Sequence, residues 1–245
     1  MTADAYLDIA KACPVEYYLA GSDGCRIEWP YRLQPADESY PRYAEQADRY
    51  IVDSAISNPD VGTRETLDKA EYVDADVAVL EDVYQDFDAT VDSVLEGMAV
   101  ADDHAFGGEL LVPLQEPHVE CWREVGEPDH VAVGGVKDAP ASEKVRVTQQ
   151  VRDAVGPDVW VHGLGFGATD AVVHAVRSDP DLLDSIDSYS PLQNVDLGTI
   201  WPGDERGSVK AIRALAELVE SCRRMTPSCT GTPDDAGATH QASLF

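Results

Sequence analysis

The sequence predicts an α/β fold, a single (β/α)₈ TIM barrel, and three observations carry that prediction. The chain has 245 residues, about the size of one barrel domain. Nearly all-apolar runs alternate with amphipathic stretches, which is typical of a parallel sheet covered by helices on both faces. No GxGxxG follows the first apolar run, and no GxxxxGK[ST] occurs, so neither nucleotide-binding fingerprint favours an open doubly wound sheet.

The expected strands are short apolar runs bounded by turn residues. They cover residues 15–22, 49–57, 75–82, 107–115, 129–136, 158–167 and 182–190, with a possible short eighth strand in 198–203. The segment 23–40 contains Pro30 and Pro35, and we expect a long loop there.

The expected helices lie between these runs. They cover residues 63–73, 88–105, 118–125, 142–156, 168–176 and 208–225. Ser142 is an expected N-cap and Gly156 an expected helix end. We assign residues 1–225 to one barrel domain. Residues 226–245 are rich in Pro, Ser, Thr, Gly and Asp, a composition that predicts a disordered tail.

The charge balance is strongly acidic. Asp and Glu number 46 and Lys and Arg 18, which gives a formal net charge of −28, and only five of the cations are lysines. An even acidic coat with few lysines is typical of salt-loving archaeal proteins. In molar salt the Debye length is about 3 Å, so such a coat repels itself little. The coat therefore does not exclude a nucleic acid partner, but it predicts poor stability at low salt.

Other classes are excluded by what the sequence lacks. There is no apolar run of about 18 residues and no basic start followed by an apolar stretch, so we expect no membrane span, no secretory signal and a cytoplasmic location. The five cysteines form no CxxC pair, and the spacing of Cys222, Cys229 and His240 matches no common zinc pattern. We therefore expect reduced thiols, no bound metal and no cofactor.

Polar residues at the carboxyl ends of the expected strands are the candidates for chemistry, because TIM-barrel active sites lie at that end. In chain order they are Asp53, Asp82, Gln115, Gly134, Gly135, His162, Gly165 and Asp187. Each has a purely structural alternative. Asp53 or Asp82 could cap a helix, Gln115 could end a strand, the glycine pair could form a turn, and His162 could be a core histidine.

The same segments carry a family resemblance. VDSAIS, ADVAVLED, VPLQ, AVGGV, VHGLGFG and LLDSIDSYSP follow one another along the chain. In this order they resemble the motifs of the tRNA-guanine transglycosylases and of their relatives that act on DNA. The last two segments are the most specific and resemble the archaeal pattern. The resemblance spans about residues 17–191, and it implies a barrel enzyme that exchanges a guanine base.

The resemblance also implies a role for each candidate. Asp187 matches the nucleophile that attacks the anomeric carbon of the ribose, and Asp53 matches the general acid and base. The remaining candidates match groups around the base: Asp82 and Gln115 for the purine edge, Gly134 and Gly135 for the base carbonyl, and His162 and Gly165 in the turn beside the substrate.

Departures from the family pattern favour its DNA branch. The DSGGF or DSGAF of the family is DSAIS here, so Ile56 and Ser57 replace a small and an aromatic residue, which puts the stacking part of the base pocket in doubt. The CxCxxC zinc cluster of the tRNA enzymes is missing, and no RNA-binding domain follows the barrel. We therefore expect 7-deazaguanine insertion into DNA, with archaeosine-type tRNA exchange as the first alternative.

Two alternatives from other classes stay open: a non-catalytic nucleic-acid-binding barrel and an unrelated barrel hydrolase or lyase. The few clustered cations lie on or beside the final helix and form either a phosphate track or a solvated helix face: Lys210, Arg213, Arg223 and Arg224. Because the chain has little cationic surface of its own, we expect a partner subunit to supply the contacts that bind the nucleic acid.

Overall fold

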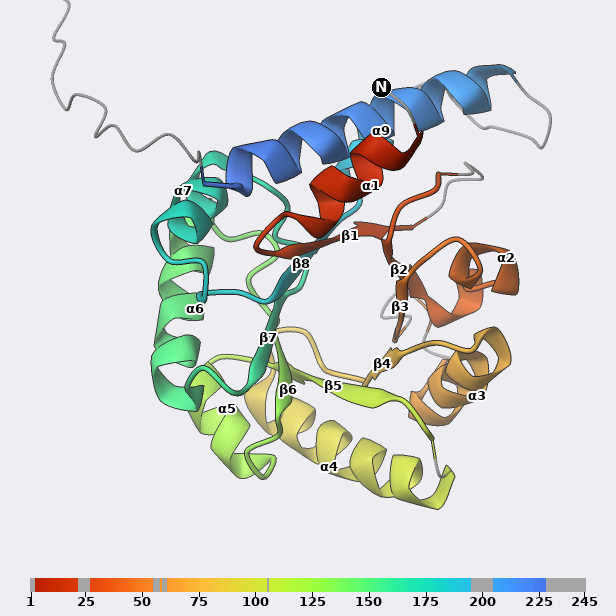
Figure 1. The fold of residues 1–245 in the computed structure, drawn as a ribbon. Helices are drawn as coiled ribbons and strands as arrows, with labels where there is room; N and C mark the ends of the chain where they lie inside the picture. The colour runs from red at the N-terminus through yellow and green to blue at the C-terminus, as the bar shows by residue number, and fades with distance from the viewer. Residues whose placement is uncertain are drawn as a thin grey trace, which may run out of the picture.

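The chain folds as a closed barrel of eight parallel strands in sequential order, with helices between the strands (Figure 1). This computed structural model describes residues 3–21, 27–54, 58, 61–104, 106–194 and 205–227. The strands are β1 (Glu16–Ala20), β2 (Tyr31–Pro35), β3 (Arg49–Asp53), β4 (Val77–Val79), β5 (Glu109–Leu114), β6 (His130–Val133), β7 (Trp160–Gly163) and β8 (Ser185–Ser188). The predicted α/β barrel is confirmed.

The helices form the outer layer of the barrel (Figure 1). They are α1 (Ala3–Lys11), the 3₁₀ turn η1 (Ala36–Glu38), α2 (Pro41–Ala44), α3 (Thr63–Val73), α4 (Phe87–His104), α5 (His118–Glu124), α6 (Ala141–Val155), α7 (Asp170–Ser178), α8 (Ser190–Gln193) and α9 (Glu205–Met225). The first helix, α1, packs beside α9, so the first and last helices of the described chain lie side by side on one side of the barrel (Figure 1).

The expected loop at 23–40 is wrong, because residues 31–35 form strand β2. This strand pairs with β1 on one side and β3 on the other. It escaped the apolar criterion because Arg32 and Gln34 occupy the positions that face away from the barrel interior, where both are buried. The Arg32 guanidinium donates to the carbonyls of Ile27 and Gly21, and Gln34 hydrogen-bonds the Tyr50 hydroxyl at 2.7 Å. Buried polar side chains that are paired in this way replace the usual apolar pattern.

The other boundaries differ by a few residues, and one cap is wrong. Ser142 does not cap α6, because the helix already begins at Ala141 and Pro140 precedes it. Gly156 ends that helix with a φ of 83°, as expected. The possible strand at 198–203 lies outside the described residues, and the eight strands close the barrel without it. Most of the expected tail, from residue 228 on, also lies outside them.

The barrel has an inner and an outer apolar layer. Side chains alternate along each strand, so every second residue faces the interior. One buried cluster takes residues from β1 to β6 and fills the interior: Tyr18, Leu33, Ile51, Val77, Val79, Leu111 and Ala132. The intervening residues, such as Tyr17, Val112, Val161 and Ile186, pack against the helices. This alternation decides which rim residues face the barrel axis.

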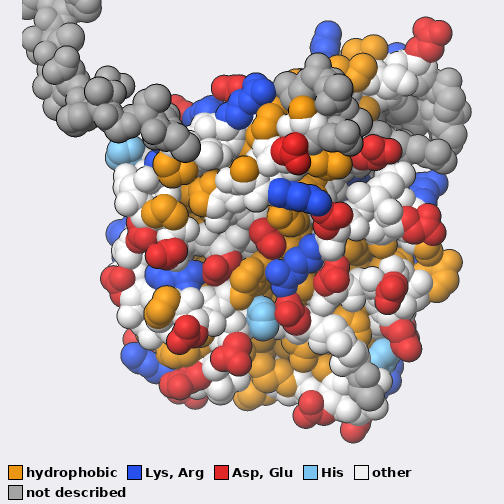
Figure 2. All heavy atoms as spheres, in the orientation of Figure 1, with side chains coloured by type: hydrophobic (Ala, Val, Ile, Leu, Met, Phe, Trp, Pro, Cys, Tyr) orange, Lys and Arg blue, Asp and Glu red, His pale blue; other side chains and the backbone are white. Residues whose placement is uncertain are grey.

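Acidic side chains are scattered over the visible face of the molecule, with cationic and apolar groups between them (Figure 2). With a net charge of −28, the folded chain repels itself wherever salt does not screen it. We expect the melting temperature to be about 10 °C or more lower in 0.05 M than in 2 M sodium chloride, roughly 3 kcal/mol for a chain of this size. Calorimetry at both salt concentrations measures the shift.

A non-ionic osmolyte provides the control for that experiment, because salts can also strengthen apolar burial. Sucrose at matched water activity should recover only a small part of the loss. A melting temperature that stays constant across the salt series would contradict the screening explanation.

Candidate active site

The structure brings the candidate residues to one end of the barrel. Because all strands are parallel, their carboxyl ends share one rim. Asp53 is the last residue of β3, and Gln115 directly follows β5. Asp82 follows β4 by three residues, and Gly134 and Gly135 directly follow β6. His162 and Asp187 lie near the ends of β7 and β8, and Gly165 follows β7 by two residues.

Two carboxylates point into the barrel mouth. Asp53 has the same orientation as Ile51, which belongs to the interior cluster, because the two lie two residues apart on β3. Asp187 contacts the interior side chain His162 and is 6% exposed. Both carboxylates therefore face the barrel axis near the same rim, as expected for a pair that works on one substrate.

The environment of Asp53 favours its protonated form. Burial raises the pKa of Asp53 well above its ordinary value of 3.8, and the negative charges of Asp187 and then Asp82 raise it further. A backbone hydrogen bond from Ser54 opposes this only in part. Asp53 is thus suited to carry a proton beside the carboxylate of Asp187.

A second group at the rim centres on Gln115, whose side chain is fully buried. Its Nε2 donates to Asp82 Oδ2, and its Oε1 accepts a 3.0 Å bond from the backbone of Gln85. Burial raises the pKa of Asp82, while the hydrogen bond from Gln115 opposes the rise. The amide retains one N–H and one lone pair beyond these bonds, so the pair forms a polar wall with remaining capacity for hydrogen bonding.

Glycine fits positions 134 and 135 because a side chain there would crowd Gln115. A Cβ on Gly134 would lie 3.0 Å from Gln115 Nε2, and a Cβ on Gly135 would lie 2.2 Å from Gln115 Oε1. Gly135 also has a φ of 70°, in the left-handed region that favours glycine. The turn after β6 therefore lies directly on the amide of Gln115, which brings its backbone to the rim.

We expect Gly135→Ala to destabilise the fold by about 2–4 kcal/mol, from left-handed strain plus displacement of Gln115. Gly126→Ala is the matched control, because Gly126 has a φ of 92° and its added Cβ would have no neighbour within 4 Å. Its expected cost is about 1–2 kcal/mol. Urea denaturation of both variants gives the difference, and equal costs would show that the contact with Gln115 is unimportant.

Asp187 is held by hydrogen bonds to both its side chain and its backbone. Its Oδ1 accepts a 2.6 Å bond from the backbone N–H of Gly165 and lies 3.1 Å from His162 Nε2. The backbone carbonyl of Asp187 accepts from Gly167 N at 3.0 Å. His162 itself has no exposed surface, so its direct contact is with Asp187, whereas the sequence had grouped it with the substrate-binding residues.

Two residues near Asp187, Ser185 and Lys144, were not among the candidates predicted from the sequence. Ser185 bonds His162 Nδ1 at 2.7 Å, and Lys144 donates from Nζ to the carbonyl of Gly165 at 3.1 Å. Burial lowers the pKa of Lys144, and the charge of Asp187 opposes that shift. Ser185 could have been found from its spacing, since it lies two residues before Asp187 on the same strand face. Lys144 carries no signal except that it shares the buried face of α6 with Val147 and Val151.

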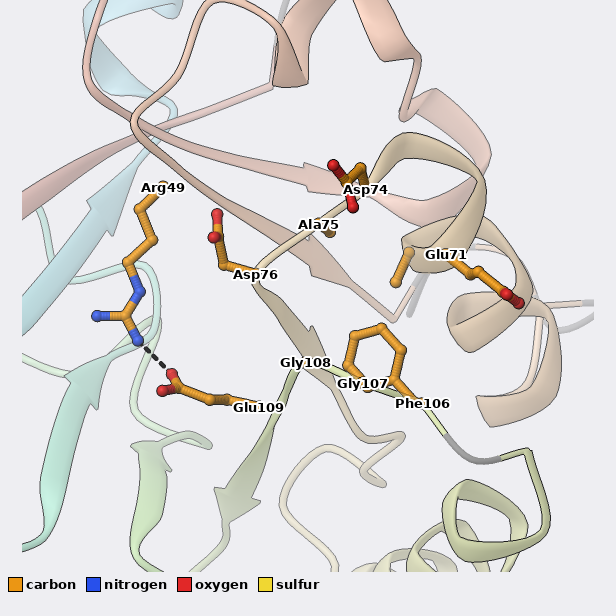
Figure 3. A pocket seen from close by; sticks show the side chains of 10 residues that line it. Arg49, Glu71, Asp74, Ala75, Asp76, Phe106, Gly107, Gly108 and Glu109 are labelled. Atoms are coloured by element: carbon orange, nitrogen blue, oxygen red, sulfur yellow. Dashed lines mark hydrogen bonds and ion pairs between the residues drawn. The ribbon is translucent and has the colours of Figure 1, made fainter.

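A hollow at the opposite end of the barrel contains none of the candidates. It measures about 660 Å³ and is lined by the residues that begin β3 and β5 and by those around them: Arg49, Ala70, Glu71, Asp74, Ala75, Asp76, Phe106, Gly107, Gly108 and Glu109. In Figure 3, Arg49 and Glu109 point toward each other and form an ion pair. Amino-terminal ends of barrel strands serve stability more often than catalysis.

The cations expected on the final helix do not form one exposed track. Lys210 is 5% exposed and lies on the packed face of α9. Arg224 pairs with Asp170 across to α7. Arg213 and Arg223 are exposed. The reason is the amphipathic helix itself, whose period turns Lys210 toward the core together with Ala214 and Leu218.

Among the described residues, no group of three or more His, Cys, Asp or Glu side chains is arranged to hold a metal ion. Cys222 interacts with Cys13, while Cys229 and His240 lie outside the described part of the chain. Of the helices that the structure describes, none combines the length and apolarity needed to cross a bilayer.

Compared with known proteins, the chain matches no family model and no curated sequence. The fold and the geometry of the rim are therefore the basis for assigning a function.

Proposed function

We propose that the protein is a base-exchange transglycosylase that replaces guanine by a 7-deazaguanine base in nucleic acid, with DNA as the favoured substrate. The observation that carries the proposal is the pair Asp53 and Asp187, which face one barrel mouth, where burial and the charge of Asp187 raise the pKa of Asp53. Two carboxyl groups at one rim, one of them with a raised pKa, suit a nucleophile and a proton carrier acting on the same glycosidic bond.

The proposed reaction has two halves. In the first, an oxygen of Asp187 attacks C1′ of the sugar as the bond to guanine N9 breaks, and Asp53 donates its proton to the departing base. In the second, Asp53 takes a proton from the incoming 7-deazaguanine, whose ring nitrogen attacks C1′ and displaces Asp187. The covalent sugar ester preserves the energy of the glycosidic bond, so no cofactor or metal is needed for the balance.

The wall of Asp82, Gln115, Gly134 and Gly135 supports recognition of a purine edge. Its carboxylate accepts from ring and exocyclic N–H groups of guanine, and its amide and backbone groups can meet the base carbonyl. An adenine in the same place would leave these buried groups unpaired, at a cost that discriminates strongly. Archaeosine-type exchange in tRNA uses the same base chemistry and is the second candidate.

The charge balance of the chain bears on how nucleic acid would be held. The chain has 46 acidic and 18 basic residues, and Lys210 and Arg224 are engaged within the protein. Phosphate contacts normally supply most of the affinity for nucleic acid, and they weaken as salt rises. A partner subunit that supplies the cationic surface fits this charge balance.

The test is incorporation of a labelled 7-deazaguanine base into duplex DNA and, in parallel, into tRNA, in molar salt. Each reaction is run alone and with proteins encoded at the same locus. Label in DNA supports the proposal, and label only in tRNA replaces DNA by the alternative substrate. Binding of nucleic acid with no label in either substrate would favour the non-catalytic barrel.

A further inference from the structure

Hydrogen-bonding contacts link the proposed nucleophile, Asp187, to His162 and then to Ser185 in the barrel interior. Ser185 Oγ is 2.7 Å from His162 Nδ1, and His162 Nε2 is 3.1 Å from Asp187 Oδ1. Ser185 and His162 have no exposed surface. These hydrogen-bonded side chains therefore reach Asp187 from the barrel interior.

The chemistry of the three groups decides where the proton of the imidazole lies. An ionised Asp187 can only accept hydrogen bonds, so the facing Nε2 must carry a hydrogen. In a neutral imidazole Nδ1 then accepts, and the hydroxyl of Ser185 can donate to it. Ser185 thus favours the one neutral tautomer that can donate to Asp187.

The imidazole is also fixed in its plane. It stacks on Trp160 with ring centroids 5.7 Å apart and an interplanar angle of 16°, and it meets the edge of Tyr18 at 5.8 Å and 80°. The Arg49 guanidinium covers the Trp160 ring at 4.9 Å. A side chain clamped in this way can hold another group in one orientation.

The two oxygens of Asp187 are consequently different. Oδ1 accepts from both Gly165 N and His162 Nε2. Within the described part of the chain, no hydrogen-bond donor is assigned to Oδ2. Oδ1 is therefore fixed by two donors, and Oδ2 is the oxygen left to form a bond with the substrate.

From this arrangement we propose that His162 is a positioning residue that acts through Asp187. It directs Oδ2 toward the sugar carbon in the first half of the reaction. In the second half its N–H stabilises the negative charge that returns to the carboxylate as the ester bond breaks. His162 neither gains nor loses a proton in either half. The inference rests on the proposed function, because it needs Asp187 to be the nucleophile.

The test compares variants in single-turnover formation of the covalent protein–nucleic acid adduct, quenched and resolved on a denaturing gel. The substrate is whichever of DNA or tRNA the wild type labels. We expect His162→Leu to form the adduct about 100-fold more slowly, a typical loss for one charge-stabilising donor, with nucleic acid affinity changed less than about 3-fold. His162→Gln should recover at least about 10-fold of that rate, because its terminal amide can donate to Oδ1.

His104→Gln is the matched control. His104 is also largely covered and faces carboxylates, Asp68 at 2.9 Å and Glu71 at 3.9 Å, but it lies at the end of α4. Its adduct rate should equal that of the wild type. Ser185→Ala, which loses only the tautomer-fixing hydroxyl, should be roughly 3- to 10-fold slow and replaces His162→Leu if that variant does not fold.

The outcomes separate the inference from its premise. A wild type that forms no adduct with either nucleic acid refutes the proposed function and, with it, this role. An active wild type with an equally fast His162→Leu refutes the role alone, and so does a His162→Gln no faster than His162→Leu. Nitrogen-15 NMR of the imidazole gives a reading independent of activity. A neutral His162 protonated on Nδ1 would overturn the inference.

Discussion

Asp187→Asn is expected to abolish the covalent adduct and base exchange, with a loss of at least about 10³-fold in rate. The amide nitrogen and oxygen of Asn are far poorer nucleophiles than a carboxylate, although the side chain has nearly the same size. The backbone of residue 187 still accepts from Gly167, so the turn after β7 keeps its anchor. The measurement is adduct formation followed by incorporation of labelled base.

Asp181→Asn is the control for this substitution. Asp181 is exposed and lies before β8, at the opposite end of the strand from the rim. It should leave the rate unchanged. Circular dichroism of both variants verifies folding, and turnover that survives in Asp187→Asn would remove this residue as the nucleophile.

Asp53→Asn is expected to slow base exchange by about 10²- to 10⁴-fold, because an amide cannot shuttle a proton between the leaving and entering bases. Nucleic acid affinity should change little. The rates of the two half-reactions, measured with and without the incoming base, show which proton transfer is lost. Full activity in Asp53→Asn would assign the proton transfers to another group.

The same substitution should make the protein more stable at neutral pH. Burial and the charge of Asp187 raise the pKa of Asp53 in the folded state above its ordinary value of 3.8. Between these two pKa values the folded chain binds more protons than the unfolded chain, so the free energy of unfolding falls as pH rises. Asn does not ionise, so Asp53→Asn removes this contribution to the pH dependence of the free energy of unfolding.

Melting temperatures between pH 5 and pH 8, in molar salt, measure that linkage. The wild type should lose stability with rising pH relative to Asp53→Asn, and Asp181→Asn should follow the wild type. An Asn variant that is less stable than the wild type at pH 7 would contradict the raised pKa. A gain in stability with loss of turnover is the usual signature of an active-site carboxylate held in an unfavourable environment.

The sequence by itself determined the barrel and its rim. Strands buried on both faces are usually apolar throughout, so β3, β5 and β6 are visible as continuous runs. The polar residue that ends such a run lies at the carboxyl end of the strand, and parallel strands bring those ends together. The apolar runs therefore sufficed to place Asp53, Gln115 and the glycine pair at one rim.

Only the tertiary structure decided which polar groups meet. Strand β2 was hidden because it contains the buried polar residues Arg32 and Gln34, which form hydrogen bonds with Gly21 and Tyr50. Lys144 donates to the carbonyl of Gly165, 21 residues along the chain, and His162 contacts Asp187, 25 residues along the chain. Local periodicity reports which face of an element is buried. It does not encode the partner on another element, because that partner is selected by the closure of the barrel.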